Sequence, residues 1–358
     1  MAEIFLDNIT HVFGKKVKAV DNVTLRIENG SLISFLGPSG CGKTTTMRII
    51  AGLLRPTTGR VYFDNVDVTE RSPQDRNVAM VFQFIVIYDK TVFENIEFPL
   101  LVRKVPKEER IKKVKRAAEL MGISSLLNYP ARKLDPGTKQ KVALARAFVR
   151  EPTVFLLDEP LTNVDPQTRL ELRKKIKELQ KDLHQTMIYV THDQAEALTL
   201  SEKIAVMNYG KILQYDIPEV LYDKPKNTFV GWFIGNPGMQ FFDVSFKRSN
   251  GTFLLDAGEF SVDVSSISNH LIKYGDELKL GIRPENVQIS SQKKNGWFNA
   301  KCAVVERIGD MYLLTLSKGR LEIKVKIKET DIKEGDTAWI NFPLEKIRVY
   351  SKSGELII

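Results

Sequence analysis

The sequence predicts an α/β domain with a mainly parallel sheet, followed by an all-β domain. Short apolar runs at 32–36, 154–157 and 187–190 are typical of buried strands, and a helical pattern follows each of them. Beyond residue 235, short strand-like runs recur with turns between them. We therefore expect an α/β domain over residues 1–235 and a small barrel or sandwich over residues 236–358.

The ends of the predicted elements are marked by particular residues. Gly52 follows the helical pattern 43–51, and glycine commonly ends a helix. Asp165 and Pro166 are favoured at the N-cap and at the first helical position, so a second helix is expected to begin there. A third helix is expected over 194–200. The segment Gly235–Gly238, with its proline and two glycines, indicates the linker between the domains.

Composition excludes several classes of protein. The hydrophobic and charged fractions, 43% and 27%, are those of an ordinary globular protein. No run approaches the roughly 20 apolar residues that span a bilayer, and the first residues lack a signal-peptide pattern. The net charge of +9 includes a basic stretch at 103–116, whose spacing favours a solvated helix face. Because aromatic residues are not interleaved with it, we expect no nucleic-acid partner.

Polar residues follow all three of the predicted strands. The segment 37–44 follows the first strand, Asp158 and Glu159 end the second, and His192 follows the third. In open α/β sheets, ligands bind beyond the carboxyl ends of the strands. These residues are therefore expected to converge on one site.

The first of these segments fits the phosphate-binding pattern G-x-x-x-x-G-K-[ST] in full. In that pattern, backbone N–H groups surround the phosphates, Lys43 reaches the β/γ oxygens, and the Thr44 hydroxyl is offered to Mg²⁺. The helix N-terminus that follows adds positive potential. A chance match is disfavoured by the strand before it and the helix after it. The predicted nucleotide-binding residues here are Gly37, Pro38, Ser39, Gly40, Cys41, Gly42, Lys43, Thr44 and Thr45.

The other two strand ends supply groups for phosphoryl transfer. Asp158 is placed to hold Mg²⁺, and Glu159 to polarise an attacking water. Two adjacent acids can also be a solvated turn, but the apolar strand before them argues against it. A lone histidine is usually structural. The place of His192 at a strand end favours a contact with the γ-phosphate instead.

The order of motifs along the chain resembles the ATPase subunit of ABC importers, in the branch that handles sugars and polyols. GPSGCGKTTT, VALARA, LLDEPLTNVD, YVTHDQAEAL and FIGNP are similar to that branch's motifs, and the resemblance covers nearly the whole chain. It implies ATP and Mg²⁺ as ligands and an OB-like, TOBE-type regulatory domain at the C-terminus, with the stretch Gly281–Glu285. It implies that Phe13 stacks on adenine, that Gln83 (Q-loop) touches Mg²⁺ with Thr44 and Asp158, and that Asp165 closes the D-loop.

The resemblance also implies the partners and the place of the chain. The catalytic set would be Lys43, Gln83, Glu159 and His192. Two ATPase subunits would hold two ATP molecules between them, each ATP lying between the phosphate-binding loop of one subunit and the signature loop of the other. Two membrane permeases and an extracellular solute-binding protein would complete the transporter. The chain would then be peripheral, on the cytoplasmic side of the cell membrane, and 84–91 would help receive the coupling helix.

The chain departs from this family at the signature loop. Where the family reads Leu-Ser-Gly-Gly-Gln, this chain has Asp135, Pro136, Gly137 and Thr138 after Leu134, with Gln140 following. An ionised Asp135 only accepts hydrogen bonds, and Pro136 has no N–H to donate. One lost hydrogen bond to a charged group is worth roughly 1.5–3 kcal/mol. A carboxylate about 4 Å from a phosphate charge adds about 4 kcal/mol of repulsion at an effective dielectric of about 20.

Three hypotheses remain open. The first is an ATP-hydrolysing subunit that forms a heterodimer with a second ATPase carrying an ordinary signature, as in glycerol-type importers. The second is a regulatory subunit that binds ATP but hydrolyses little. The third is a homodimeric sugar-importer ATPase with two slow sites. The phrases Phe82–Phe84 and Leu134–Gly137 are similar to one member of the glycerol-type pairs, which favours glycerol or a related polyol as the solute.

Overall fold

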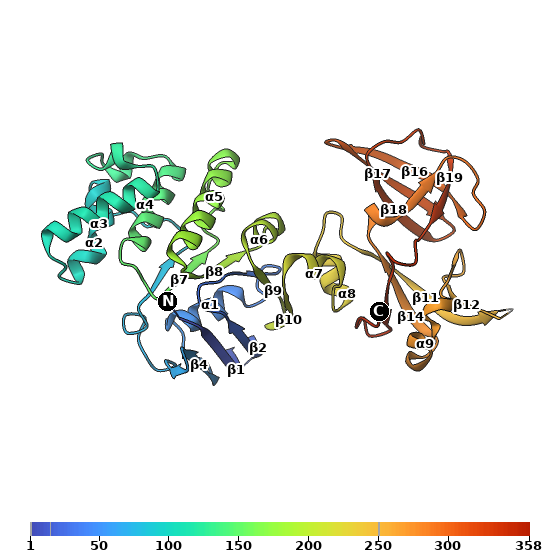
Figure 1. The fold of residues 1–358 in the computed structure, drawn as a ribbon, viewed down its shortest axis with the longest axis horizontal. Helices are drawn as coiled ribbons and strands as arrows, with labels where there is room; N and C mark the ends of the chain where they lie inside the picture. The colour runs from blue at the N-terminus through green and yellow to red at the C-terminus, as the bar shows by residue number, and fades with distance from the viewer. Residues whose placement is uncertain (1, 15, 250) are drawn as a thin grey trace. The chain divides into compact units, whose positions relative to one another are not determined.

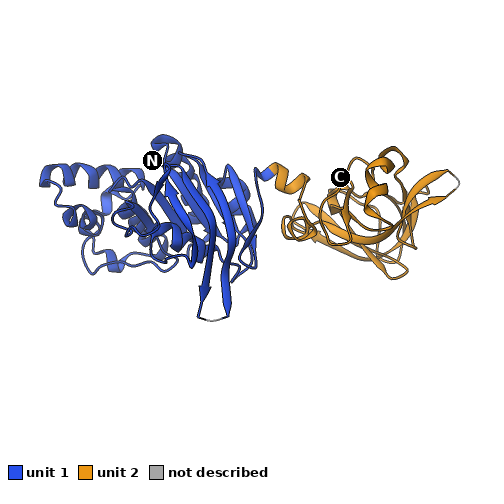
Figure 2. Cartoon of the chain, turned by 90° about the horizontal axis from the view of Figure 1, so that it is seen from below, with its two compact units in different colours: residues 1–218 blue, residues 219–358 orange. Residues whose placement is uncertain are grey.

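The computed structural model describes residues 2–14, 16–249 and 251–358. The chain forms two compact units, residues 1–218 and residues 219–358 (Figure 2). Within the described ranges, no helix is both long and apolar enough to cross a membrane.

The centre of the first unit is a six-stranded sheet in the order β10-β9-β3-β8-β7-β6. Five of its strands are parallel, and β10 joins antiparallel at one edge. The strands are β3 (Leu32–Leu36), β6 (Val78–Val81), β7 (Val154–Asp158), β8 (Thr186–Thr191), β9 (Lys203–Asn208) and β10 (Lys211–Asp216). The three predicted strands lie next to one another as β3, β8 and β7, which confirms the mainly parallel α/β fold.

Both faces of this sheet are buried, which explains why its strands read as unbroken apolar runs. Phe155 and Leu157 of β7 face one core, shared with helices α2 (Val92–Val102), α3 (Lys107–Leu120), α4 (Pro136–Phe148) and α5 (Pro166–Leu183). Val154 and Leu156 face a second core. That core lies between the six-stranded sheet, helix α1 (Lys43–Ala51) and a four-stranded antiparallel sheet. Figure 1 shows helices α2 to α5 on one side of the six-stranded sheet and the four-stranded sheet on the other.

The four-stranded sheet was not predicted. Its order is β2-β1-β4-β5, from β1 (Ile4–Phe13), β2 (Val17–Ile27), β4 (Thr58–Phe63) and β5 (Val66–Asp67). The register of β1 and β2 shifts at several points, so alternation of apolar residues along them is interrupted. This interruption hides the strands from a pattern search.

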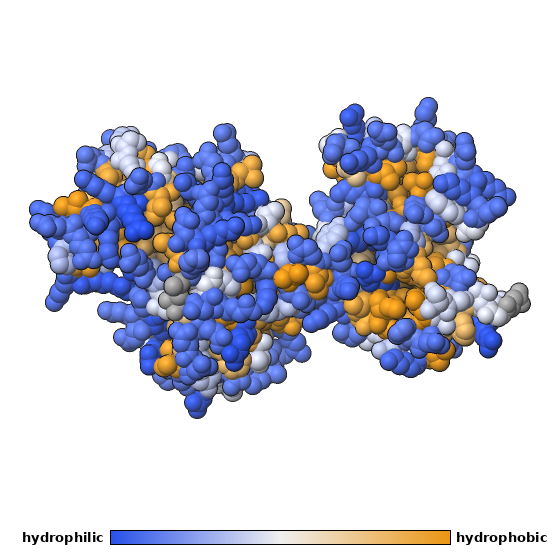
Figure 3. All heavy atoms as spheres, in the orientation of Figure 1, coloured by the Kyte–Doolittle hydropathy of each residue, from blue (hydrophilic) through white to orange (hydrophobic). Residues whose placement is uncertain are grey.

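In the basic stretch, Arg103 caps the end of α2, and residues 107–116 lie in α3, as expected. Val114, Ala117 and Ala118 are its buried residues, and most of its lysines and arginines are exposed. On the face that Figure 3 shows, hydrophilic residues cover most of each unit and hydrophobic ones form separate patches.

The second unit is an all-β domain of two antiparallel five-stranded sheets around one core. One sheet contains β13 (Ser261–Asp263), β12 (Thr252–Asp256), β11 (Gln240–Ser249), β14 (Glu277–Ile282) and β20 (Arg348–Ser351). The other contains β15 (Gln288–Ser290), β19 (Thr337–Asn341), β16 (Phe298–Ile308), β17 (Met311–Lys318) and β18 (Leu321–Ile327). The strand-like runs that the sequence shows all fall within these strands, at 253–255, 278–280, 303–305, 312–314, 321–323 and 338–340.

The division between the units falls before the sequence boundary expected at 235/236. Helix α7 (Pro218–Asp223) begins at the last residue of the first unit, and α8 (Thr228–Phe233) lies in the second. Arg283, which is 2% exposed, donates from Nη1 to the Ile234 carbonyl at 2.6 Å and from Nε to the Tyr222 carbonyl at 2.9 Å. The Tyr350 hydroxyl donates to the Pro225 carbonyl at 3.1 Å. These long-range bonds, invisible in the local sequence, hold 219–235 to the β strands.

Candidate functional site

The loop between β3 and α1 is shaped by glycine. Gly42, the N-cap of α1, has φ 107°, and a Cβ there would lie 2.3 Å from the Ala19 carbonyl oxygen. A side chain would therefore be both strained and blocked. The turn leaves the first backbone N–H groups of α1 at the end of β3, where a helix N-terminus favours anions.

Lys43 is folded back over this loop. Its Nζ donates to the carbonyl oxygens of Gly37 at 2.7 Å and Pro38 at 2.9 Å. Cys41 lies 3.8 Å from the same Nζ and is 4% exposed. Burial raises the pKa of the Cys41 thiol, which disfavours the reactive thiolate. This cysteine therefore has the environment of a small filler residue.

Asp158 and Thr44 meet beneath the loop. The Thr44 hydroxyl donates to Asp158 Oδ1 at 3.0 Å. Burial raises the pKa of the Asp158 carboxyl, against the opposing effect of the Thr44 hydrogen bond. A hydroxyl and a carboxylate side by side are oxygen ligands of the kind that Mg²⁺ takes from proteins alongside substrate phosphates. The pair therefore fits a magnesium ion.

Glu159 is the centre of a second cluster. Its Oε2 accepts hydrogen bonds from Gln83 Nε2 at 3.3 Å, Thr162 Oγ1 at 3.3 Å and His192 Nδ1 at 3.1 Å. Glu159 itself has φ 46°, an uncommon conformation for a residue with a side chain. Its N–H is held by the Val190 carbonyl at 2.9 Å. Neighbouring strands thus fix the backbone of this carboxylate next to the histidine.

The two clusters and the loop enclose one pocket of 490 Å³. Pockets for small ligands commonly measure about 300–1,000 Å³. The residues lining it are Ser39, Gly40, Cys41, Gly42, Lys43, Thr44, Thr45, Gln83, Glu159 and His192. The expected convergence of strand ends on one site is therefore seen, with Gln83 brought in from the end of β6.

Of the residues predicted to bind the nucleotide or Mg²⁺, four lie outside the lining of this pocket. Asp158 sits behind Thr44, with 6% exposure. Gly37 and Pro38 contribute the carbonyls that hold Lys43. Phe13, at the end of β1, is 45% exposed and meets the edge of His11 at 4.5 Å between ring centroids. Part of its side chain is therefore accessible to a ligand.

The signature residues form the start of α4. Asp135 is its N-cap, and Oδ1 accepts from the Thr138 N–H at 2.9 Å, while Pro136 is the first helical residue. Hydrogen bonds from Thr138 hold the pKa of the Asp135 carboxyl below its usual range. Gly137 and Gln140 are buried. An ionised carboxylate thus occupies the helix N-terminus that would otherwise attract an anion.

The D-loop contains contacts that sequence analysis missed. Asp165 caps α5, as expected, by accepting from the Thr168 N–H at 3.0 Å, and the missed contacts precede it. Asn163 Nδ2 donates to the Gln83 carbonyl at 3.4 Å, and Thr162 reaches Glu159. Thr162 and Asn163 are separated from the acidic pair by only two residues in the sequence, and only this closeness could have suggested their role.

Comparison with known proteins gives matches in both units. A family model described as ABC transporter matches residues 20–162, and a TOBE domain model matches residues 280–349. The trehalose/maltose import ATP-binding protein MalK of Thermococcus litoralis is 40% identical over 99% of this chain and 98% of its own length. The oligosaccharides import ATP-binding protein MsmX of Bacillus subtilis is 38% identical over 100% of both. The sn-glycerol-3-phosphate import ATP-binding protein UgpC of Escherichia coli is 36% identical over 98% of both.

Solved structures resemble the first unit. The cbiO1 protein from Clostridium perfringens, part of the ABC transporter complex cbiONQ, has a TM-score of 0.57 and 29% identity over 60% of this chain and 88% of that chain. A dimeric bacterial ABC transporter cassette, MJ0796, has a TM-score of 0.55 and 30% identity over 60% of this chain and 98% of that chain.

Fold and matches agree on the class of protein: an ABC transporter ATPase domain followed by a TOBE β domain. Because the curated relatives align along both units, the sequence resemblance is confirmed at the level of the family as well. The chain belongs to the family of ATP-binding subunits of ABC importers for carbohydrates and polyols.

Proposed function

We propose that this chain binds ATP and Mg²⁺ in the pocket between the loop 37–45 and His192, and hydrolyses the γ-phosphate to power an importer. The observation that carries this proposal is the placement of Glu159 and His192 across one pocket from the phosphate-binding loop. Lys43 and the loop amides bind the phosphates, and Phe13 stacks on the adenine. Thr44, Asp158 and Gln83 hold Mg²⁺, which supplies charge neutralisation at the phosphate oxygens.

In this proposal the chain's own residues prepare the attacking water. The Glu159 carboxylate accepts a hydrogen bond from the water and takes up its proton, and His192 donates to the γ-phosphate. Gln83 reaches Glu159 from the end of β6, so a movement of the Q-loop moves a contact of the catalytic carboxylate. Closure on ATP and opening after hydrolysis then shift the populations of two arrangements.

The test is Glu159→Gln, which keeps the shape but cannot take the proton. We expect ATP hydrolysis to be lost while ATP binding remains, with ATP-bound dimers accumulating. Glu151→Gln is a matched control, since Glu151 has the similar φ of 47° and its carboxylate contacts Lys113 rather than the pocket. Ordinary turnover by Glu159→Gln would contradict the proposed role.

We also propose that the chain works in a heterodimer with a second ATPase that carries an ordinary signature. The support is the ionised Asp135 and the N–H-free Pro136 at the start of α4, which oppose a partner's γ-phosphate. This chain's own pocket, by contrast, contains the residues that the family uses for ATP hydrolysis, among them Lys43, Glu159 and His192. We expect the purified chain alone to turn over slowly. Asp135→Ser combined with Pro136→Gly should raise that rate, and ordinary turnover by the unaltered chain alone would count against the heterodimer.

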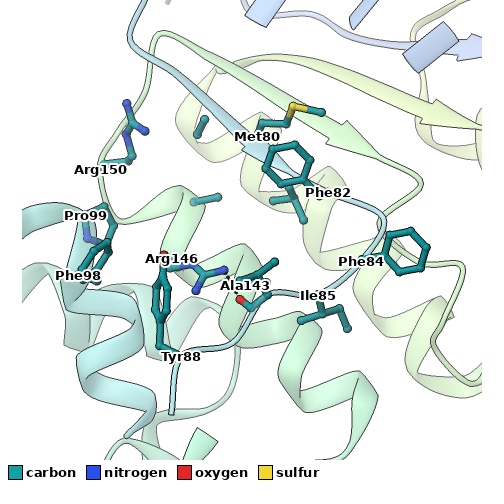
Figure 4. A pocket seen from close by; sticks show the side chains of 14 residues that line it. Met80, Phe82, Phe84, Ile85, Tyr88, Phe98, Pro99, Ala143, Arg146 and Arg150 are labelled. Atoms are coloured by element: carbon teal, nitrogen blue, oxygen red, sulfur yellow. Dashed lines mark hydrogen bonds between the residues drawn. The ribbon is translucent and has the colours of Figure 1, made fainter. Parts of the chain in front are cut away.

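The surface next to the Q-loop is proposed to receive a helix of a membrane permease, which would place the chain at the cytoplasmic face of the membrane. Phe82, Phe84, Ile85, Tyr88 and Phe98 line a groove there, with Arg146 stacked 5.1 Å from the Tyr88 ring centroid (Figure 4). Phe84 is 76% exposed, unusual for phenylalanine unless a partner covers it. Phe84→Asp should weaken assembly with the permeases without weakening ATP binding.

The solute is proposed to be a sugar or polyol, with glycerol favoured. The relatives are named as import proteins for trehalose/maltose, oligosaccharides and sn-glycerol-3-phosphate. The preference for glycerol rests on the sequence Asp135-Pro136-Gly137 and on Phe82–Phe84, as described above. Uptake of labelled glycerol by vesicles carrying the whole transporter, with maltose as the comparison solute, tests this preference.

A further inference from the structure

Arg169, in the first turn of α5, contacts two different segments of the candidate site. Its Nη2 donates to the Val164 carbonyl at 3.3 Å, and its Nη1 lies 3.9 Å from Asp193 Oδ2. Val164 belongs to the D-loop, and Asp193 directly follows His192. One guanidinium therefore joins the D-loop to the turn that carries the histidine.

Asp193 fixes the geometry of that turn. Its Oδ1 accepts from the Glu196 N–H at 3.1 Å and so caps α6 (Gln194–Leu200). Its own N–H donates to Thr191 Oγ1 at 2.9 Å. Since both the backbone and the side chain of Asp193 are held, a shift of its carboxylate is passed to the adjacent His192.

Arg173, one turn further along α5, supports the same turn without touching the D-loop. Its Nη2 lies 3.8 Å from Asp193 Oδ2 and 3.5 Å from Glu196 Oε1. Glu196 is 4% exposed and accepts from Tyr189 and Thr191, each at 2.9 Å. Arg173 is therefore a natural comparison for Arg169: it has the same charge and the same acidic neighbour, but no contact with Val164 is present.

A hydrogen bond to a carbonyl together with an ion pair to a carboxylate suits an arginine at position 169. The guanidinium is a planar fork with donors in fixed directions, whereas a lysine ammonium is a point charge on a flexible stem. Lysine at position 169 would keep the attraction to Asp193 but could not hold the Val164 carbonyl in the same geometry.

We propose that Arg169 is a positioning residue that couples the D-loop to His192. A second ATPase subunit pressing on the D-loop moves the Val164 carbonyl, Arg169 follows, and Asp193 carries the shift to His192 beside Glu159. This inference rests on the proposed function. It explains how contact with a second ATPase subunit would change the position of His192 at the hydrolytic site.

The test is amide hydrogen exchange on the full chain, as the unaltered protein and as Arg169→Met, Arg169→Lys and Arg173→Lys. We expect Arg169→Met to speed exchange about tenfold in both 162–165 and 191–194, as local opening becomes easier. Arg169→Lys should speed exchange at 162–165 only. Arg173→Lys should leave 162–165 unchanged.

The inference is overturned if Arg169→Met changes only one of the two segments, or if exchange rises along all of α5, which would mark a general packing defect. Mg·ATP binding is measured on the same samples and should be retained in every variant, with at most a small loss through His192 in Arg169→Met, because neither arginine lines the pocket. Absence of Mg·ATP binding by the unaltered chain would instead refute the proposed function, so the two failures are distinguishable.

Discussion

Among single residues, Asp158 has the most distinctive environment, because its carboxyl must be ionised to hold a cation although burial favours the neutral form. Its raised pKa means that protons compete with Mg²⁺ at a higher pH than at an ordinary aspartate. We expect Mg²⁺-dependent ATP affinity to fall on acidification while the pH is still above the usual aspartate range of about 4. Titration of Mg·ATP binding against pH in the Glu159→Gln background, which avoids turnover, measures this.

The comparison for this prediction is Asp158→Asn, which has no proton to exchange. Its Mg·ATP affinity should be weak at neutral pH, and the pH dependence that remains should be that of the ATP phosphates, which titrate with a pKa of about 6. Affinity of the unaltered side chain that stays constant down to the ordinary aspartate pKa would show that Asp158 does not hold the cation.

The sequence predicts residues well where the signal is local. Ser39–Thr44, Glu159 and His192 line one pocket, with Asp158 bonded to Thr44 behind it, because each segment stands at the end of its own buried strand. Gln83 could be found only from its place in the order of motifs. Arg169 could not be found, since its value lies in contacts with Val164 and Asp193 that arise from packing between α5 and α6.

At the scale of elements, the start of α4 combines a stability role with the altered signature. Asp135 caps the helix, and its lowered pKa means that this stabilisation is present above the unfolded pKa and is lost as pH falls through the folded value. Asp135→Ala should lower stability by about 1 kcal/mol, and Asp135→Ser should not, because serine also caps.

All three tryptophans, Trp232, Trp297 and Trp339, lie in the second unit, so helical circular dichroism is the appropriate signal for unfolding of the first. Urea unfolding at neutral pH, followed in this way, distinguishes the two variants. Equal destabilisation by alanine and serine would mean that the carboxylate acts through its charge rather than as a cap.

Helices and strands, like single residues, were predicted where the signal is local and missed where it depends on distant parts of the chain. The helix over Pro166–Leu183 begins where Asp165 and Pro166 indicate, and β3 matches its apolar run. The N-terminal sheet was missed because β1 pairs with β4 across a long stretch of chain and its pairing with β2 contains register shifts. Short helices such as α7 and α8 give too little periodicity to reveal their partner unit.

At the scale of the whole molecule, the boundary between the units can be tested by truncation. Arg283 is buried and donates three hydrogen bonds to the carbonyls of Tyr222 and Ile234. Its guanidinium lies 3.6 Å from the Tyr222 ring centroid. A fragment 219–358 keeps these partners, and a fragment 236–358 removes them. At about 1.5–3 kcal/mol for each bond from a charged group, the shorter fragment loses a large part of a domain's stability of about 5–15 kcal/mol.

We therefore expect 219–358 to unfold cooperatively in urea, and 236–358 to be unfolded or much less stable, as followed by the fluorescence of Trp297 and Trp339. Arg283→Met separates the lost hydrogen bonds from other effects of truncation. It should destabilise 219–358, where the guanidinium bonds the Tyr222 and Ile234 carbonyls, and have little effect on 236–358, where those partners are absent. If both fragments were equally stable, residues 219–235 would be a linker, and the boundary would lie at 235/236 as the glycine and proline pattern suggested.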